Sequence, residues 1–190
     1  MKYHHHWIVG IVAITSSLFA PALLAQQSWL GVSGGSSETD EFCDGFGFGF
    51  GIDCDDTDTG IKAFIGADIT PHFGIEAFWA DLGEASARNT SGDSVKVEVD
   101  GIGFSLLPTL PVSDDFQLFG KIGLFAWDAE AEANISGNRA RASDDGSDPF
   151  YGFGARLFLG DQFALRAEWE RYDLDGDEVT LMSAGAEFRF

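Results

Sequence analysis

The chain has 190 residues, 45% of them hydrophobic, and a formal net charge of −20 at pH 7. Its length suits one domain, and its hydrophobic fraction is too high for a disordered chain. The acidity excludes a nucleic-acid-binding protein, because phosphates would be repelled and the sequence has no basic patch. Glycine (24 residues) and phenylalanine (18) are abundant, which favours β-structure over helices.

The first 25 residues are predicted to be a secretory signal peptide. Lys2 gives a basic start, Trp7 to Ala20 is apolar, and small or apolar residues precede an expected cleavage after Ala25. The apolar part has about 14 residues, fewer than the ~20 that a membrane-spanning helix needs. The histidines at positions 4–6 then belong to the discarded part and form no metal site. Residues 26–190 are predicted to form one outer-membrane β-barrel domain.

The first predicted strand covers residues 28–36. In the next two, residues 61–69 and 73–80, the side chains alternate between an uncharged face and a face that carries charges. The same alternation recurs in residues 117–126, 151–159, 163–170 and 180–190. In these six alternating segments, one face has no charged residue at all. A Lys or Arg facing lipid costs about 2–4 kcal/mol, so we expect the uncharged face to contact lipid. The alternative is a soluble barrel in which the same face forms the core.

The other face of these strands carries every charge, and we expect it to line a narrow lumen. Charges buried there must pair, because an unpaired one costs several kcal/mol. The sequence does not determine which residue pairs with which. The predicted lumen charges are Lys62, Asp68, Glu76, Lys121, Arg156, Arg166, Glu168, Glu170, Glu187 and Arg189.

The fourth strand is predicted at residues 93–107, where the apolar residues change face between Val99 and Ile102. Either Gly101 marks a β-bulge, or the part from Val95 to Val99 stands above the membrane. The total is eight strands, an even number as in bacterial outer-membrane barrels. The predicted fold is all-β, an eight-stranded antiparallel up-and-down transmembrane β-barrel.

The connections alternate in length, which predicts the orientation of the barrel. Short turns at residues 70–72, 111–115 and 160–162 are expected to face the periplasm, and the longer loops to face outside. The longer loops are residues 37–58, 86–93, 131–148 and 173–177. Two aromatic girdles are expected, one near each end. They comprise Phe73, Phe116, Phe163, Phe188 and Phe190 near the short turns, and Trp79, Trp127, Tyr151 and Trp169 near the loops.

Cys43 and Cys54 in the first long loop are predicted to form a disulfide, since export through the periplasm favours oxidation. Closing so short a loop stabilises the fold by about 3 kcal/mol in the entropic account. Glycine and phenylalanine alternate over residues 44–51, between the two cysteines. This segment is either a hairpin that extends the barrel or an exposed aromatic ridge for contact with a host surface or another barrel.

Residues 53–60 and 173–178 are acidic, with oxygen ligands at alternate positions that would suit Ca²⁺. Neither stretch matches an EF-hand loop, so they are solvated acidic loops or weak divalent sites. No cofactor or metal site is predicted. The mature chain has one histidine, His72, in a predicted periplasmic turn. Glu168 and Glu170 are better explained as paired lumen charges than as an acid–base pair, so no catalysis is expected.

Several segments resemble OmpA-like transmembrane domains, namely residues 73–83 (FGIEAFWADLG), 151–156 (YGFGAR) and 165–172 (LRAEWERY). The ending Ala186 to Phe190 resembles a terminal strand, whose Phe188 and Phe190 would be read by the barrel-assembly machinery. The resemblance implies a largely plugged polar interior, with Glu76, Lys121, Arg156 and Arg166 at inward positions. Many members of this family carry a C-terminal peptidoglycan-binding domain, which we do not expect here because the chain stops on the last strand.

Together these features predict a protein of the cell outer membrane, exported through the periplasm. Its expected partners are outer-membrane lipid and lipopolysaccharide, the barrel-assembly machinery, and an external surface partner bound through the loops. The expected role is structural or adhesion-like. The alternative is a narrow passive porin-like channel with a charged lumen.

Overall fold

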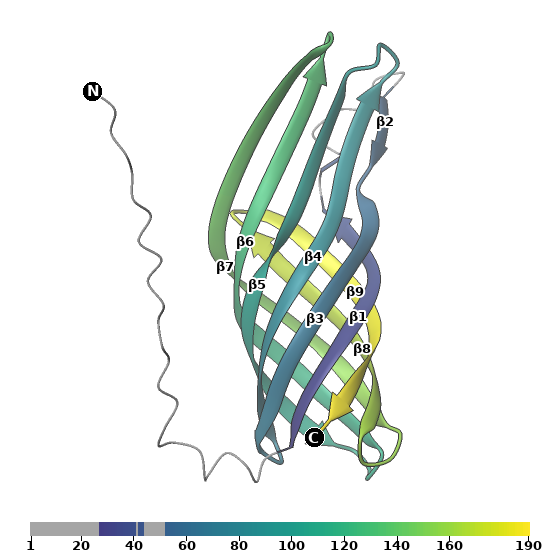
Figure 1. The fold of residues 1–190 in the computed structure, drawn as a ribbon, viewed down its shortest axis with the longest axis vertical. Coiled ribbons are helices and arrows are strands. Elements are labelled where there is room, and N and C mark those ends of the chain that lie inside the picture. Colours follow the sequence, from purple (N-terminus) through teal and green to yellow (C-terminus); the bar gives the residue numbers. More distant parts are fainter. Residues whose placement is uncertain (1–26, 41, 44–51) are drawn as a thin grey trace, which may run out of the picture.

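The computed structural model describes residues 27–40, 42–43 and 52–190. Within these residues nine β-strands form one antiparallel sheet (Figure 1). No helix in this part of the chain is long and apolar enough to cross a membrane. The strands are β1 (Ser28–Thr39), β2 (Ile52–Asp55), β3 (Thr57–Thr70), β4 (Phe73–Asn89), β5 (Ser94–Pro111), β6 (Phe116–Ile135), β7 (Asn138–Phe158), β8 (Phe163–Leu174) and β9 (Asp177–Arg189).

Eight of these strands close into a ring. β1 pairs with both β3 and β9, the order continues through β8, β7 and β6 to β5, and β5 pairs with β4. β2 lies outside the ring, along the upper part of β4. The predicted eight-stranded antiparallel barrel is therefore confirmed.

The apolar face of each strand lies on the outside of the barrel and the charged face on the inside, as the alternation predicts. Ile102 is 65% exposed on the outside, whereas Glu76 is only 1% exposed on the inside. A soluble barrel would have the reverse arrangement, so the alternative of an apolar core is wrong. Large apolar side chains are exposed around the outside, including Leu30, Val32, Ile61, Ile65, Phe104, Ile122, Leu124, Phe153, Leu165 and Met182.

The short turns lie together at one end of the barrel, as expected, and the chain ends there too (Figure 1). At the other end, the expected long loops are wrong in two places. Most of residues 131–148 and half of residues 86–93 are strand, and Ser136-Gly137 alone closes the hairpin of β6 and β7. Ser136 and Gly137 have φ values of 54° and 81°. Two positive φ values are what a two-residue hairpin turn of type I′ requires.

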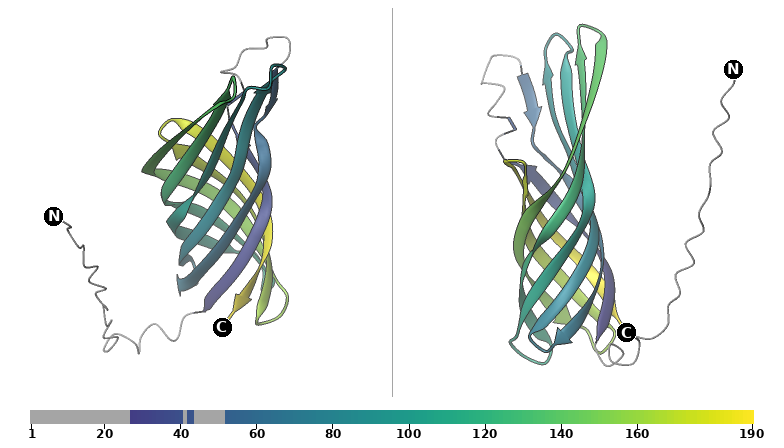
Figure 2. Two further views of the ribbon diagram at one scale, coloured as in Figure 1. Left: turned by 45° about the horizontal axis from the view of Figure 1, so that its top comes forward. Right: turned by 90° about the vertical axis from the view of Figure 1, so that its left-hand side faces the viewer.

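These long strands form a sheet that rises from one side of the barrel (Figure 2). β4 to β7 continue upward beyond the ends of β8, β9 and β1. We call this part the protruding sheet. It comprises residues 52–55, 84–89, 94–99, 129–135 and 138–149.

The fourth ring strand, β5, has no bulge at Gly101. It stays in register with β6 through Asp100, Gly101 and Ile102, and Val99 faces the same side as buried Gly101. The register shift lies instead in β4, between Asp81 and Glu84. The second alternative fits, because Val95 to Val99 continues into the protruding sheet.

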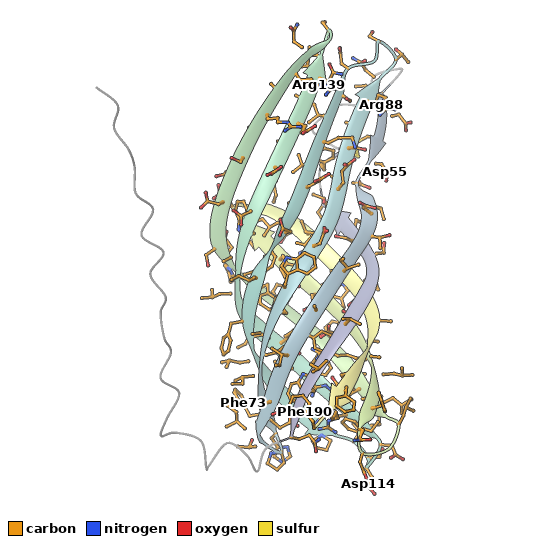
Figure 3. The ribbon with its side chains drawn as sticks, in the orientation of Figure 1. Asp55, Phe73, Arg88, Asp114, Arg139 and Phe190 are labelled. Atoms are coloured by element: carbon orange, nitrogen blue, oxygen red, sulfur yellow. A yellow bond between two sulfur atoms is a disulfide. The ribbon has the colours of Figure 1, made fainter. Side chains whose placement is uncertain are left out.

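Exposed aromatic residues lie at both ends of the apolar belt. Phe73 and Phe190 lie at the short-turn end, while Arg139 marks the tip of the protruding sheet (Figure 3). Trp79 is exposed at the end of the belt nearest the protruding sheet. The prediction that Trp127 belongs to this girdle is wrong, since Trp127 is 5% exposed and faces inward. Its Nε1 donates a hydrogen bond to Asp148 Oδ2 at 2.8 Å.

Candidate functional site

Lys121, on β6, is the centre of a buried ion cluster inside the barrel. Its Nζ lies 2.7 Å from Glu76 Oε1, 2.7 Å from Glu170 Oε1 and 3.2 Å from Glu168 Oε1. Lys62 Nζ, on β3, lies 2.5 Å from Glu170 Oε2 and also pairs with Glu168. These side chains meet because each occupies an inward position on its strand. The arrangement leaves each lysine with at least two carboxylate partners.

Arg166 extends the cluster towards the short-turn end. Its Nη1 lies 2.6 Å from Glu76 Oε2 and 3.5 Å from Glu187 Oε2, and the guanidinium also pairs with Glu168. Arg156 Nε lies 3.1 Å from Glu187 Oε2. Glu76 and Glu187 thus connect cations from different strands. Removing one partner from such a buried network leaves another charge uncompensated, which is strongly destabilising.

Aromatic rings separate the arginines from each other and fill the remaining width. The guanidinium of Arg156 lies 4.2 Å from the ring centre of Trp29 and 4.9 Å from that of Phe119. The guanidinium of Arg166 lies 4.6 Å from the same Phe119 ring centre. Arg156 Nη1 also donates a hydrogen bond to Gln117 Oε1 at 3.1 Å. Cation–π contacts of this kind are strongest where water is excluded.

At the short-turn end, Arg189 Nη2 lies 3.2 Å from Asp68 Oδ2. The structure therefore brings all the predicted lumen charges inside the barrel and supplies the pairings that the sequence left open. Their positive and negative charges are equal in number. The excess that gives the chain its formal charge of −20 consequently lies outside this set of ten residues.

A layer of aromatic rings lies above the lysines and was not expected from the sequence. Phe78 and Phe150 have ring centres 5.2 Å apart, and Tyr172 lies 4.9 Å from Phe125 and 5.1 Å from Phe150. Lys121 Nζ lies 5.0 Å from the Phe78 ring centre. The inward parity of each ring was readable from the alternation, but their meeting at one level was not. The layer and the ion cluster together fill the lumen below its outer end.

Above this layer is a cavity of about 350 Å³ at the outer end of the lumen. Apolar and acidic side chains line it together. They include Leu82, Val97, Trp127, Leu174, Asp144 and Asp177.

Carboxylates stand in rows on the outer surface, just above the apolar belt. Asp81, Asp100, Asp128 and Asp145 lie directly opposite one another on β4, β5, β6 and β7. Like charges directly opposite each other destabilise a sheet. The four aspartates thus cost stability, and they concentrate negative charge at one side of the barrel.

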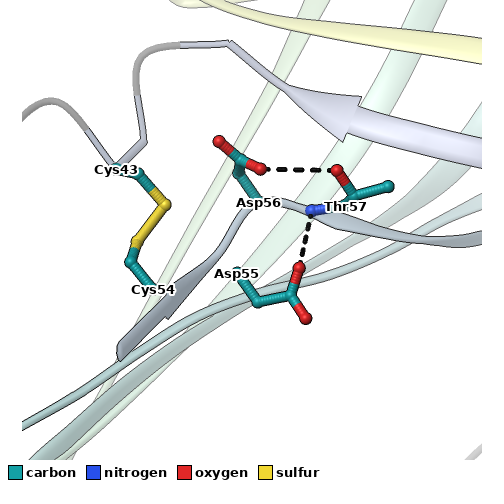
Figure 4. The surroundings of a disulfide bond; sticks show 5 residues. All are labelled: Cys43, Cys54, Asp55, Asp56 and Thr57. Atoms are coloured by element: carbon teal, nitrogen blue, oxygen red, sulfur yellow. Dashed lines mark hydrogen bonds between the residues drawn. A yellow bond between two sulfur atoms is a disulfide. The ribbon is translucent and has the colours of Figure 1, made fainter. Parts of the chain in front are cut away.

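The disulfide between Cys43 and Cys54 is present and confirms that prediction (Figure 4). It ties the chain after β1 to β2. Beside it, Thr57 N donates to Asp55 Oδ1 and Thr57 Oγ1 donates to Asp56 Oδ1, both at 3.3 Å. The Gly–Phe segment 44–51 and the predicted signal peptide 1–25 lie outside the described residues.

In each of the two acidic stretches, a carboxylate accepts a hydrogen bond from a backbone amide. Asp58 Oδ2 accepts a hydrogen bond from Glu84 N at 2.8 Å, and Asp173 Oδ1 accepts one from Gly176 N at 3.1 Å. In the part of the chain that the structure describes, no group of three or more His, Cys, Asp or Glu residues is placed to hold a metal ion. His72 is exposed in the turn between β3 and β4, at the end opposite the protruding sheet.

Several known proteins share this architecture. The crystal structure of Ail, the attachment invasion locus protein of Yersinia pestis, matches with a TM-score of 0.62 and 16% identity, covering 87% of this chain and 99% of that one. The N-terminal β-barrel domain of Pseudomonas aeruginosa OprF matches with a TM-score of 0.53 and 11% identity, covering 87% and 99%. At these identities the likeness shows the fold alone.

Curated relatives match by sequence. Outer membrane protein A of Shigella flexneri is 27% identical over 142 residues, which cover 69% of this chain and 40% of that protein. Outer membrane protein A of Salmonella typhi is 25% identical over the same length and shares. The match thus spans less than half the length of these relatives. The family model described as "Outer membrane protein beta-barrel domain" matches residues 10–190. The chain therefore belongs to the outer membrane protein β-barrel domain family, and it is an OmpA-like protein of the Gram-negative outer membrane.

Proposed function

We propose that this barrel is a structural and surface-interaction protein whose protruding sheet is its contact surface. The observation that carries the proposal is the combination of a filled lumen with strands that continue far beyond the ring. β6 and β7 stay paired from Phe116 and Leu157 up to Ile135 and Asn138 at the tip. A barrel that served only to span the membrane would need no such extension, since about 9–11 residues per strand suffice.

A narrow passive pore is the competing function, and the contents of the lumen argue against it. Eight-stranded barrels are just wide enough for side chains to fill. Here, the ring of Phe78 lies against Lys121, whose charge is already matched by three glutamates. An ion would have to displace both to pass.

Planar-bilayer conductance of the refolded protein tests this choice, after heat-modifiable gel mobility has shown that it is folded. We expect no stable single-channel steps. Steps that change in Glu76→Ala or Lys121→Ala would overturn the proposal and establish a pore with a charge gate.

The contact role is tested with a shortened hairpin. Trp127 and Gly146 lie directly opposite each other and, like Ile135 and Asn138 at the tip, form a hydrogen-bonded pair. Deleting residues 128–145 and joining these two by Asn-Gly therefore keeps the register in a two-residue turn. The deletion removes five carboxylates and two arginines, so it makes the outer surface less acidic. Cells that display the native protein should attach to polylysine-coated glass, because the outer surface is acidic. The shortened variant should attach less while its barrel still folds. Equal attachment by both proteins would contradict the proposal.

The structure of Ail has been solved in complex with the heparin analogue sucrose octasulfate, and the acidity of the present protein predicts that it does not bind this polyanion. A polyanion should be repelled by the rows of carboxylates at Asp100 and Asp128. We expect no binding of sucrose octasulfate at physiological salt, as measured by isothermal titration calorimetry. Micromolar binding would show that the acidic rows do not control recognition.

Catalysis is not part of the proposed function. The carboxylates of Glu168 and Glu170 are held in ion pairs with Lys62 and Lys121. His72 lies in a turn at the other end of the barrel. The matched families support a non-enzymatic role.

The proposal includes two steps of biogenesis. Residues 1–25 act as the signal peptide, leaving residues 26–190 as the barrel domain among lipid and lipopolysaccharide. Phe188 and Phe190, whose ring centres lie 6.3 Å apart, are the signal read by the barrel-assembly machinery. Phe190→Ala should lower the folded fraction in cells, measured by heat-modifiable mobility, yet refold normally in vitro. A variant that assembles normally in cells would remove this role.

A further inference from the structure

The outer edge of β7 in the protruding sheet has no partner strand among the described residues. Residues 139–149 pair with β6 on one side, and pairing with β8 begins only at Phe150 (Figure 1). Most of this stretch is exposed. An unpaired edge presents backbone N–H and C=O groups to which another strand can bind.

The turn of the hairpin decides which backbone groups point to the free side. Ile135 and Asn138 flank the two-residue turn and exchange hydrogen bonds, so even-numbered residues of β7 bond to β6. On that side, the backbone amide of Asp145 donates to the neighbouring Asp144 Oδ1 at 3.0 Å. The residues whose backbone groups face the free side are Arg139, Arg141, Ser143, Asp145 and Ser147.

The charges along this edge are divided into two halves. Arg139 and Arg141 lie towards the tip, and Asp145 lies towards the barrel, all on the outer face. If two such edges pair antiparallel with Ser143 opposite Ser143, each Arg141 stands opposite an Asp145. Each Arg139 then stands opposite Ser147. Cross-strand pairs of opposite charge stabilise a sheet, and like charges destabilise it.

Only one relative orientation of two membranes permits this pairing. Two copies in one membrane present β7 in the same direction, so their edges meet in parallel and bring Arg141 near Arg141. A copy in a facing membrane is inverted, and its edge meets the first one antiparallel. We propose that the β7 edge binds the same edge of a second copy in a facing membrane and so joins the two membranes. This inference rests on the proposed contact role of the protruding sheet.

Arg141 is available for this pairing although it already has a partner. Its Nη2 lies 2.5 Å from Glu132 Oε1 on β6, but the two side chains are 75% and 48% exposed. Exposed ion pairs of this kind contribute little and exchange readily. An incoming aspartate can therefore share the guanidinium.

The test uses the refolded protein in phosphatidylcholine vesicles, with the outward orientation of the protruding sheet verified by protease cleavage. Vesicles labelled with a donor or an acceptor dye are mixed, and clustering is read by energy transfer. We expect the native protein to cluster its vesicles. Vesicles that stay dispersed at every protein density would overturn the proposal.

Charge reversal in two complementary variants separates edge pairing from general stickiness. Arg139→Asp/Arg141→Asp makes the edge acidic, and Asp145→Arg/Ser147→Arg makes it basic. Each variant alone should cluster about tenfold less, because like charges then face each other in both arms. Vesicles of the first variant mixed with vesicles of the second should cluster like the native protein. Two folded variants that fail to cluster when mixed would overturn the proposed register.

Asp128→Arg provides the matched control, because Asp128 lies beside Asp145 on the same face but one strand inside the edge. We expect clustering within about twofold of the native level, since cross-strand effects act on direct neighbours. A loss equal to that of the edge variants would assign the effect to overall charge and overturn the proposal. If the hairpin-shortened variant loses attachment to polylysine while native vesicles stay dispersed, the contact role stands and only the self-pairing falls.

Discussion

Asp93 Oδ1 accepts a hydrogen bond from the backbone amide of Ser136 at 2.7 Å. Asp93 lies in the turn between β4 and β5, and Ser136 lies in the turn between β6 and β7, so this bond joins the tips of two hairpins. Asn89 Nδ2 donates to the other carboxylate oxygen of Asp93 at 3.0 Å. The bond from the Ser136 backbone, followed by that from Asn89, lowers the pKa of Asp93 below its ordinary value of 3.8.

The joint between the tips should therefore depend on pH. Because the folded pKa of Asp93 lies below 3.8, its stabilising contribution is present above pH 3.8 and is lost as the pH falls through the folded value. Amide hydrogen exchange of Ser136 in lipid nanodiscs measures this. We expect protection at pH 6 that disappears in strong acid, and low protection at both pH values in Asp93→Ala. Unchanged protection in that variant would show that the tips are held by other contacts.

Glu98 and Glu84 give the protruding sheet a response of the opposite sign. A hydrogen bond with the carboxyl of Glu84 is the main cause that raises the pKa of Glu98, although Lys96 Nζ lies 2.6 Å from Glu84 Oε1. A raised folded pKa means that folding favours protonated Glu98. The sheet should thus gain stability as the pH falls through the raised value.

Glu98→Gln replaces the charged group with a neutral one of the same shape. We expect slower amide exchange in β5 at pH 7 and a weaker dependence of exchange on pH. Asp114→Asn, in the turn at the other end of the barrel, is the control and should leave β5 unchanged. Faster exchange in Glu98→Gln would contradict the assignment, because it would mean that ionised Glu98 stabilises the sheet.

Loss of Lys121 should be among the most destabilising single changes inside the barrel. Lys121→Met leaves Glu76, Glu168 and Glu170 with one cation fewer, at an expected cost of about 3–5 kcal/mol. Lys121→Met/Glu170→Gln removes one charge of each sign and should recover part of this loss. The measurement is the urea midpoint of folding into lipid vesicles. Lys96→Met on the exposed surface should shift stability by less than about 0.5 kcal/mol. Additive effects of the two lumen substitutions would show that Lys121 and Glu170 do not interact.

The sequence predicts which way each side chain of the barrel points, because alternation has a strict period of two. Ile61 and Lys62 are sufficient to orient β3, since only one of them tolerates lipid. Trp127 shows the limit of applying a family expectation in place of this rule. It shares its parity with Phe125, which indicates the interior, whereas an aromatic residue near a loop suggested the girdle. The structure follows the parity.

The partners inside the lumen depend on the stagger between strands, which the sequence does not express. Lys121 on β6 meets Glu170 on β8 only because the tilt of the strands brings these positions to one level. The length of the protruding strands was in principle readable. Ser136-Gly137 sits between two alternating runs, which is a strong hairpin signal. The length and polarity of residues 131–148 indicated a loop instead, because polar residues on an exposed sheet look like loop residues.

At several places inside the barrel, a glycine lies against an aromatic ring. Phe78 lies directly opposite Gly103 on β5, and the atoms nearest to a Cβ at Gly103 all belong to the Phe78 ring. The ring is confined on its other side by Phe150, 5.2 Å away. Because the ring is held between these two neighbours, Gly103→Ala should cost about 1–3 kcal/mol through overpacking.

Gly34→Ala is the matched control on another strand of the same barrel. A Cβ there would lie 3.6 Å from Gly60 O and 3.7 Å from Ile61 Cγ2, which are ordinary contacts. Its urea midpoint in lipid vesicles should stay close to that of the native protein. Gly103→Ala/Phe78→Leu should recover part of the lost stability, because the smaller side chain makes room for the methyl group. If the two single glycine variants lose the same amount, the cost comes from the strand backbone and not from the ring, and the aromatic layer is looser than its packing indicates.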